Sequence, residues 1–249
     1  MTNITEEAKR LMDEYQADRK ISAKGKPLFI AVCGSHYFGY PSAKSDIDVR
    51  GVYLAPTENL LRLRKKVKEP TISQRKGNLD LEIDELGHFL SLVAHSNGSR
   101  FEWVNSPLLI SASDEYQNLQ NLVNTAGVSR RLINYYLNFS RNQQHKPIET
   151  TKRDFHTIRG YLTGIALAET GRLVFDMREL STMFDYDEAK KIAESKQTGK
   201  PQAENQEKLA ELIRNLDARL VAGIEKSGLP ETPDIQKINN FLVRIRQAS

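Results

Sequence analysis

The chain has 249 residues, of which 39% are hydrophobic and 27% charged, a composition typical of a globular protein. It contains no apolar stretch near the ~20 residues that span a bilayer, and its single cysteine, Cys33, excludes an intrachain disulfide. The N-terminal residues lack the basic and apolar regions of a signal peptide, so we expect a cytoplasmic protein without a membrane partner. The net charge of +4 permits a polyanionic partner without establishing one.

The first segments of the chain predict one helix and two strands. Residues 4–19 have apolar side chains at helical spacing. The run "PLFIAVC" is short and apolar and predicts a buried strand, and the alternating run "DIDVRGVYLAP" predicts a second strand, which Pro56 ends. The basic run "RLRKKVK", from Arg62 to Lys68, favours either a solvated loop or a surface that contacts phosphates.

The next segment has the most regular pattern of the chain. In "NLDLEIDEL" the apolar residues share one face of a predicted strand, and Asp80, Glu82 and Asp84 share the other. From Asp84 the apolar period becomes helical, and "SNG" is expected to end that helix. The segment "RFEWVNSPLLIS" then completes an α/β part near residue 112.

The remaining sequence has helical patterns. They cover residues 114–126, 128–144, 150–171, 186–197, 204–226 and 233–247. The order of elements predicts an α+β protein, in which a mixed β-sheet with flanking helices is followed by an all-helical domain. We place the first domain at residues 1–112 and the second at residues 113–249.

Two aspartates begin the second predicted strand. Asp46 and Asp48 are two residues apart, so their side chains leave the same face about 7 Å from each other. Their charges repel unless a cation lies between them, and carboxylates with substrate phosphates are the ligands that Mg²⁺ prefers. Asp80 or Glu82 can supply a third carboxylate if the two strands are neighbours. Relief of the repulsion also predicts that asparagine at position 46 or 48 leaves the apo-protein at least as stable.

Three carboxylates on neighbouring strands are what a two-metal phosphoryl-transfer site needs. Gly34 and Ser35, after the first strand, suit a turn that holds phosphate, because glycine lets the backbone approach and serine adds a hydroxyl donor. An EF-hand is excluded, because the later ligands of that loop are absent after "DIDVRG". A solvated strand face explains Asp80 and Glu82 nearly as well as chemistry does, and D-x-D alone is a weak signal.

The ordered combination resembles a known signature. The pattern G-S followed by S-D-x-D, here at residues 45–48, is similar to that of the DNA polymerase β-type nucleotidyltransferase superfamily. Within it, "GSHYFGYPSAKSDIDVRGVYLAP" and "DLEIDELGHFLSLVAHSNGSRFEWVNSP" resemble the RNA-repair nucleotidyltransferases called RlaP. The segments "KRDFHTIRGYL" and "LPETPDIQKINNFL" are similar to the helical half of that family, so the resemblance covers most of the chain.

The resemblance implies an activity and a set of binding residues. The fold would be a polymerase β-like nucleotidyltransferase domain followed by a helical domain. The reaction would be transfer of an NMP from an NTP, with two Mg²⁺ ions that Mn²⁺ can replace. By motif match, Gly34, Ser35 and Ser45 would bind the nucleotide, and Asp46 and Asp48 the metal ions.

The third carboxylate has two candidates, Asp80 and Glu82, which share a face. Asp80 aligns best with the family, and we expect it to be the deeper and better buried of the two, because the next helix is expected to begin near Asp84. The chain departs from the resemblance at Gly87-His88, where most of the family has a basic residue. This departure leaves the local substrate contacts open.

A helix through residues 152–165 is predicted to contribute cations to the site. Lys152 and Arg159 lie at the edge of its apolar stripe, which suits a groove where side chains meet phosphate. We therefore expect both to bind the nucleotide, and the helical domain to complete the cleft for nucleotide and acceptor. An exposed helix flank explains the same pattern.

Three functions are compatible with these features. The leading hypothesis is addition of a nucleotide to an RNA or tRNA 3′ end or another hydroxyl acceptor. The second is the same chemistry on protein hydroxyls, or in an antitoxin-like partner. The third, a catalytically inactive RNA-binding module, is disfavoured because every candidate carboxylate is present. The oligomeric state and the identity of the NTP do not follow from the sequence.

Overall fold

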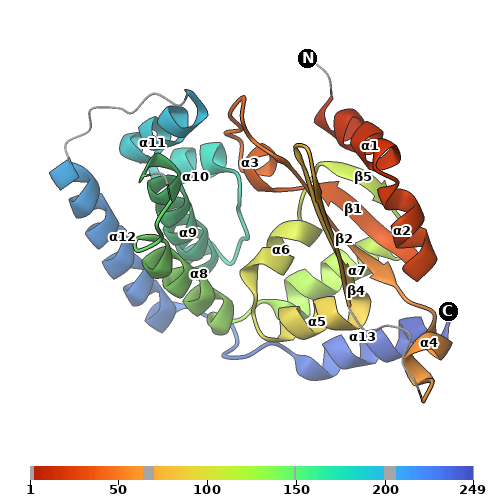
Figure 1. Ribbon diagram of the computed structural model, residues 1–249. Coiled ribbons are helices and arrows are strands. Elements are labelled where there is room, and N and C mark those ends of the chain that lie inside the picture. The colour runs from red at the N-terminus through yellow and green to blue at the C-terminus, as the bar shows by residue number, and fades with distance from the viewer. Residues whose placement is uncertain (1–2, 64–69, 149, 199–205, 249) are drawn as a thin grey trace. The chain divides into compact units, whose positions relative to one another are not determined.

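The computed structural model describes residues 3–63, 70–148, 150–198 and 206–248. The chain divides into two compact units, and Figure 1 labels the elements of both. Unit 1 consists of Met1–Tyr37, Ser45–Gly127 and Pro233–Ser249, and unit 2 of Phe38–Lys44 and Val128–Thr232. The predicted boundary at residue 112 therefore falls inside unit 1, and the last helix, predicted in the helical domain, belongs to unit 1.

Among the described residues, unit 1 contains a five-stranded mixed sheet. Its strands are β1 (Lys26–Val32), β2 (Ile47–Leu54), β3 (Thr71–Lys76), β4 (Leu79–Glu85) and β5 (Leu109–Ala112). They lie in the order β3-β4-β2-β1-β5. β2 and β4 run parallel, and the other neighbours are antiparallel. The predicted α+β class with a mixed sheet is confirmed.

The helices of unit 1 cover both faces of this sheet. They are α1 (Ile4–Glu14), α2 (Ala17–Lys24), α3 (Gly34–Tyr37), α4 (Thr57–Leu61), α5 (Leu86–Ala94), α6 (Gly98–Val104), α7 (Tyr116–Leu122) and α13 (Ile235–Gln247), with a π-helical turn at Val123–Gly127. The alternation of each strand decides which side chains meet them, because successive residues point to opposite faces. Leu11 of α1 and Ile21 of α2 belong to one buried cluster with Val49 and Leu81.

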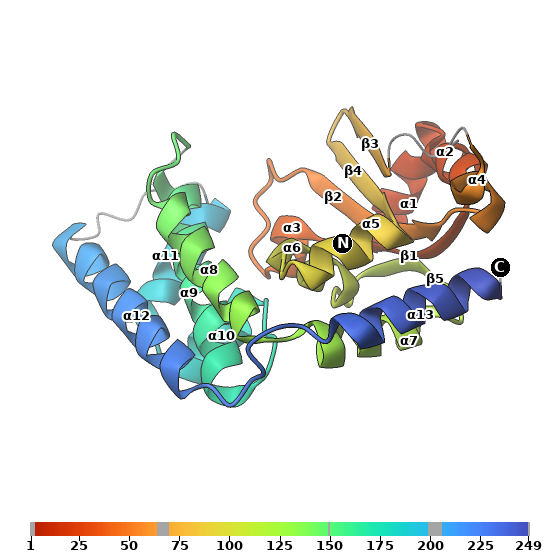
Figure 2. The ribbon, with the colours of Figure 1, turned by 90° about the horizontal axis from the view of Figure 1, so that it is seen from below.

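The opposite face of the sheet is apolar at one end and polar at the other. Phe29 of β1 packs against Phe89 of α5 (centroids 6.3 Å apart) and Tyr116 of α7 (5.3 Å). α13 packs against α5 and α7, and Figure 2 shows it alongside α7. The polar side chains of this face lie toward the start of β2 and β4, which begin at the same edge because Ile47 pairs with Leu79.

Unit 2 is helical in its described residues. Its helices are α8 (Arg130–Gln143), α9 (Thr150–Thr170), α10 (Met177–Phe184), α11 (Asp187–Thr198) and α12 (Gln206–Lys226). The long α9 packs against the other four, and its middle turns are buried. Tyr136 of α8 is fully buried beside it, while Tyr135 is partly exposed and stacks on Phe139.

Several elements differ from the sequence predictions. The helix predicted at residues 4–19 is two helices, because Gln16 has a left-handed backbone (φ 57°) between them. β3 is not predicted, since "TISQRK" has a single apolar side chain, Ile72. α10 is not predicted either. Among the described residues, no helix is both long and apolar enough to cross a membrane.

Candidate active site

The turn after β1 lies against the start of β2. The backbone N–H of Cys33 donates to the carbonyl of Asp48 (2.7 Å). Gly34 has φ +59°, a left-handed conformation that glycine adopts without strain, and a side chain here would collide with the Asp48 carboxylate. Gly34 and Ser35 begin α3, a single short turn of helix. The structure thus brings the predicted phosphate turn and Asp48 together.

The predicted carboxylates share one face at the start of β2 and β4. Asp48 and Asp80 are Cα partners in the parallel pair, and neighbouring strands lie ~4.8 Å apart. Arg75 of β3 is the partner of Asp80 and binds Asp46 at 2.8 Å, so Asp46 reaches the same face. Ser45, just before it, is partly buried. The side chains of Asp48 and Asp80 are 26% and 30% exposed, so a ligand can reach both.

Arg50 lies between two of these carboxylates. It follows Asp48 by two residues on β2 and therefore points to the same face. Its guanidinium donates to Asp48 Oδ1 (2.8 Å) and to the backbone carbonyls of Asp80 (2.6 Å) and Val49 (3.0 Å), and lies 3.5 Å from Asp80 Oδ1. Arg50 is not among the predicted site residues, although its two-residue spacing from Asp48 is a signal for this contact.

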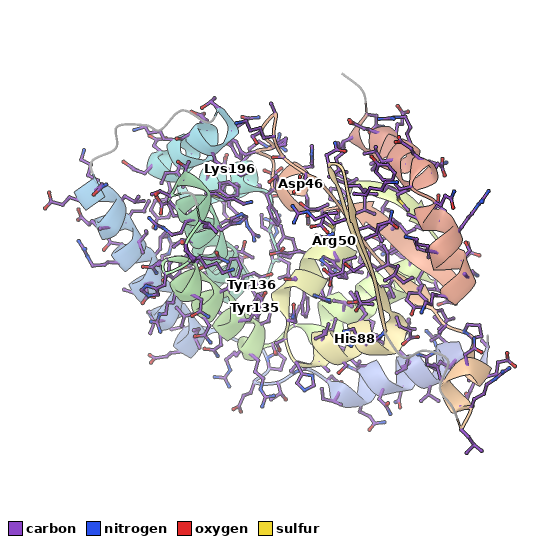
Figure 3. The ribbon with its side chains drawn as sticks, viewed as in Figure 1. Asp46, Arg50, His88, Tyr135, Tyr136 and Lys196 are labelled. Carbon is purple, nitrogen blue, oxygen red and sulfur yellow. The ribbon has the colours of Figure 1, made fainter. Side chains whose placement is uncertain are left out.

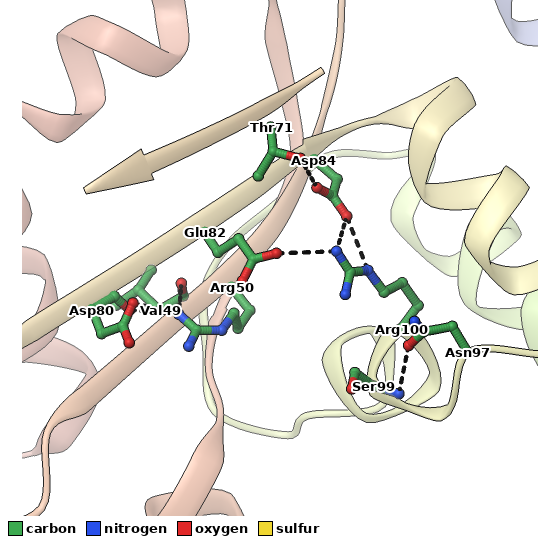
Figure 4. Close-up of polar contacts among 9 residues, drawn as sticks. All are labelled: Val49, Arg50, Thr71, Asp80, Glu82, Asp84, Asn97, Ser99 and Arg100. Carbon is green, nitrogen blue, oxygen red and sulfur yellow. Dashed lines mark hydrogen bonds and ion pairs between the residues drawn. The ribbon is translucent and has the colours of Figure 1, made fainter. Parts of the chain in front are cut away.

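Glu82 belongs to a different group of charges. Arg100 of α6 binds Glu82 Oε1 at 3.1 Å and Asp84 Oδ2 at 2.7 Å, as Figure 4 shows. Asp84 is fully buried and also accepts from the hydroxyl of Thr71 (2.7 Å). The Arg100 guanidinium lies 4.0 Å from the ring centroid of Trp103. Glu82 thus helps to join α6 to the sheet.

Asp80 does not lie deeper in its strand than Glu82, contrary to the expectation from the sequence. β4 begins at Leu79 and continues to Glu85, so Asp80 is near its start and Glu82 near its middle. Their exposed fractions, 30% and 35%, are also close. What distinguishes them is register: Asp80 lies opposite Asp48, and Glu82 opposite Arg50.

The donor chemistry of this face fits a divalent cation. Carboxylate oxygens are the hard ligands that Mg²⁺ prefers, and Asp46, Asp48 and Asp80 are the residues that would hold it. Within the part of the chain that the structure describes, no three or more His, Cys, Asp or Glu side chains are arranged to hold a metal ion. The oxygens contact Arg50 and Arg75 instead.

Comparison with known proteins identifies the family. The model of RlaP, the RNA repair pathway DNA polymerase beta family, matches residues 3–244. The chain belongs to the RlaP family. It is therefore a nucleotidyltransferase of the DNA polymerase β type, as the resemblance predicts.

The comparisons with curated proteins and with solved structures give less information about this chain. No curated protein matches the chain. One solved structure that matches the chain is the crystal structure of a nucleotidyltransferase-like protein from Exiguobacterium sibiricum, which is 11% identical. The alignment covers 98% of this chain and 80% of that chain, with a TM-score of 0.31. A likeness at this level says nothing about individual site residues.

The departure from the RlaP pattern at Gly87-His88 lies far from the carboxylates. Gly87 is in the first turn of α5, after the end of β4 at Glu85. At about 3.3 Å per residue, Glu85 is roughly 17 Å along the strand from Asp80. Figure 3 labels His88 on α5, apart from Asp46 and Arg50. The missing basic residue therefore does not alter the polar face around Asp48.

Residues 38–44, between the two halves of the RlaP motif, belong to unit 2 and are bound by its helices. The carbonyl of Phe38 accepts from the N–H of Met177 (3.1 Å), and that of Tyr40 from Nζ of Lys196 (2.7 Å). Arg159 lies 3.8 Å from the ring centroid of Phe38 and is only 2% exposed. In this structure Arg159 therefore packs against the loop at residues 38–44.

The other predicted cations have different surroundings. Lys152 is exposed on α9, where a phosphate can reach it. The predicted roles of Lys152 and Arg159 in nucleotide binding stay predictions. In the basic run, Arg62 pairs with Glu58 (3.2 Å), and residues 64–69 lie outside the described residues.

The environment of His156 should make the free energy of unfolding depend on pH. Burial first, and then the charges of Arg159, Lys196 and Lys152, hold its pKa well below the ordinary value. The unfolded chain therefore binds a proton that the folded protein does not, so the free energy of unfolding rises with pH up to about pH 7 and then levels off. We expect urea unfolding to show a loss of stability as the pH falls below ~6.5, at most ~1.4 kcal/mol per pH unit from this residue.

The substitution His156→Gln isolates this contribution. The variant should lack the part of the slope below pH ~6.5 that one histidine supplies, while other titrating groups stay the same in both proteins. Stability curves of wild type and variant that run parallel across this range would contradict the assignment.

Proposed function

We propose that the protein transfers an NMP from an NTP to a hydroxyl at an RNA or tRNA 3′ end, with Mg²⁺. The observation that carries this proposal is the pairing of Asp48 with Asp80 on parallel strands, beside the turn at Gly34. This arrangement joins a carboxylate pair to a backbone turn that phosphate can approach. The family's description as an RNA repair pathway supports RNA as the acceptor.

In this proposal, the residues of the site have separate roles in binding the triphosphate and the metal ions. Gly34 and Ser35 present backbone N–H groups and a hydroxyl to the triphosphate, and Ser45 adds a second hydroxyl near Asp46. Asp46, Asp48 and Asp80 would hold two Mg²⁺ ions, and these would supply positive charge beside the acceptor hydroxyl and the phosphates. Lys152 keeps its proposed role as a contact for phosphate.

The reaction exchanges one phosphorus–oxygen bond for another. The oxygen of the acceptor hydroxyl bonds to the α-phosphorus, and the bond from this phosphorus to the bridging oxygen of the β-phosphate breaks. Pyrophosphate leaves with the electron pair of that bond. The proton of the hydroxyl passes to Asp80, which lies opposite Asp48. Asp80 is partly exposed and so can pass the proton on to water.

The test offers the protein a choice of donors and acceptors. Each NTP, labelled at the α-phosphate, is incubated with Mg²⁺ and with RNA, tRNA or a protein mixture. We expect the label on RNA or tRNA, and its loss when the 3′-terminal diol is oxidised beforehand. Label on protein would replace the RNA acceptor with a protein hydroxyl. Absence of label from every acceptor, with all four NTPs, would refute the proposed activity.

A further inference from the structure

Arg50 already supplies a positive charge where the proposed function requires a metal ion. Its guanidinium contacts Asp48 Oδ1 at 2.8 Å and lies 3.5 Å from Asp80 Oδ1. Figure 4 shows it beside Asp80 and Val49, whose carbonyls it also contacts. These backbone contacts help to hold the guanidinium between the two strands.

The partners of Arg50 are not the ones that strand register alone favours. Its partner across the strand pair is Glu82, and residues that lie opposite each other normally interact. Glu82 instead binds Arg100, which the buried Asp84 also holds. Arg50 instead contacts Asp48, two residues before it on β2.

Three arginines form ion pairs with the carboxylates of this face, but they do not neutralise its charge. Arg75 forms an ion pair with Asp46, and Arg50 forms ion pairs with Asp48 and Asp80. Arg100 forms ion pairs with Glu82 and Asp84. The group thus contains five carboxylates and three guanidiniums. The group therefore retains two negative charges, the charge that one divalent ion balances. The Arg50 side chain is 13% exposed, so water screens its charge less than that of an exposed ion pair.

We propose that Arg50 is a built-in cation that competes with the divalent ion for Asp48 and Asp80. This inference rests on the proposed function, since it assumes that these carboxylates bind the metal. A guanidinium stays protonated at all working pH values, so its charge opposes a second cation at this distance. The carboxylates remain ordered without metal, and the ion binds weakly until the phosphates of a bound NTP offset the charge of Arg50.

Binding of Mn²⁺ in the absence of nucleotide tests the competition. Free Mn²⁺ is measured by electron paramagnetic resonance during titration of the wild type and of Arg50→Gln. We expect the variant to bind Mn²⁺ with a dissociation constant at least ~10-fold lower, because removal of one nearby positive charge favours the ion. We also expect its melting temperature to be lower than that of the wild type without metal, and to rise more when Mn²⁺ is added.

Two further variants serve as controls. Arg75→Gln removes the same charge from Asp46, but the Arg75 side chain is 71% exposed, so its effect on Mn²⁺ affinity should be under ~3-fold. Arg50→Lys keeps the charge and loses the planar fork that bridges several acceptors. It should give an affinity between those of the wild type and Arg50→Gln, and it replaces that variant if Arg50→Gln does not fold.

The outcomes separate this inference from the function on which it rests. Equal or weaker Mn²⁺ binding by Arg50→Gln, with clear binding by the wild type, would overturn the competition and leave the metal site in place. If Arg75→Gln changes Mn²⁺ affinity as much as Arg50→Gln does, the effect comes from the overall charge of the face. That result would overturn the specific competition by Arg50 as well. If neither the wild type nor any variant binds Mn²⁺ at these carboxylates, the metal site itself is wrong.

Discussion

Asp48→Asn is expected to lower the rate of nucleotidyl transfer by roughly 10³-fold or more, the scale of losing a principal charge-stabilising group. Asp48 is the point where the parts of the site meet: it lies beside Gly34, opposite Asp80, and in contact with Arg50. A neutral amide is a poor ligand for Mg²⁺. It would also leave the charge of Arg50 in the site without its main counter-charge.

The structure changes the expected effect of this substitution on stability. Repulsion between Asp46 and Asp48, taken alone, predicts an apo-protein at least as stable as the wild type. Because Asp48 binds Arg50 in a partly buried pair, we instead expect Asp48→Asn to lose ~0.5–1.5 kcal/mol of unfolding free energy. Asp46→Asn breaks only the exposed pair with Arg75 and should stay close to the wild type.

The measurement combines single-turnover kinetics with thermal unfolding. Asp114→Asn makes the same chemical change at an exposed site and should leave both readouts unchanged. Transfer by Asp48→Asn at the wild-type rate, in the presence of Mg²⁺, would remove Asp48 from the site. A large loss of stability with transfer retained per folded molecule would show that the role of Asp48 is structural.

The elements with a clear period are the ones that the sequence predicts correctly. β1 is a continuous apolar run, and β4 alternates from Leu79 to Ile83, so burial alone decides their structure. β3 gives no such signal, because an edge strand is stabilised by its hydrogen bonds to β4 and little by burial. The helix α13 shows a helical period, but its position in unit 1 depends on long-range packing against α5, which no local pattern reveals.

The same distinction holds for the site. The two-residue spacing of Asp46 and Asp48 predicts a shared face, and in the structure Asp46 contacts Arg75, the Cα partner of Asp80. Which groups meet that face depends on strand order and register, since a neighbouring strand brings its own side chains. The pairing of β2 with β4 and β3 places Arg75 near Asp46 and leaves Arg50 between the carboxylates. The contacts of these arginines with the carboxylates depend on strand pairing, so the local spacing of the acidic residues does not reveal them.

Asp80→Asn should reduce the chemical step by about 10²-fold or more, while Glu82→Gln should have a much smaller effect. Asp80 lies opposite Asp48, where its carboxylate can act on the acceptor hydroxyl. Glu82 is engaged by Arg100, with Asp84 as a second partner, and so holds α6 against the sheet. The two substitutions are matched, because each replaces one carboxylate by its amide on the same face of β4.

NTP binding provides the readout that separates chemistry from general damage. Asp80→Asn leaves intact the bond of Arg50 to the backbone carbonyl of residue 80 (2.6 Å), so the strand pair should keep its structure. Nucleotide affinity should then change little, because Asp46, Asp48 and the turn at Gly34 remain. Single-turnover rates measured at saturating NTP compare the two variants directly. If Glu82→Gln proves the slower enzyme, Glu82 is the third carboxylate, and the register of β2 with β4 is then not what selects it.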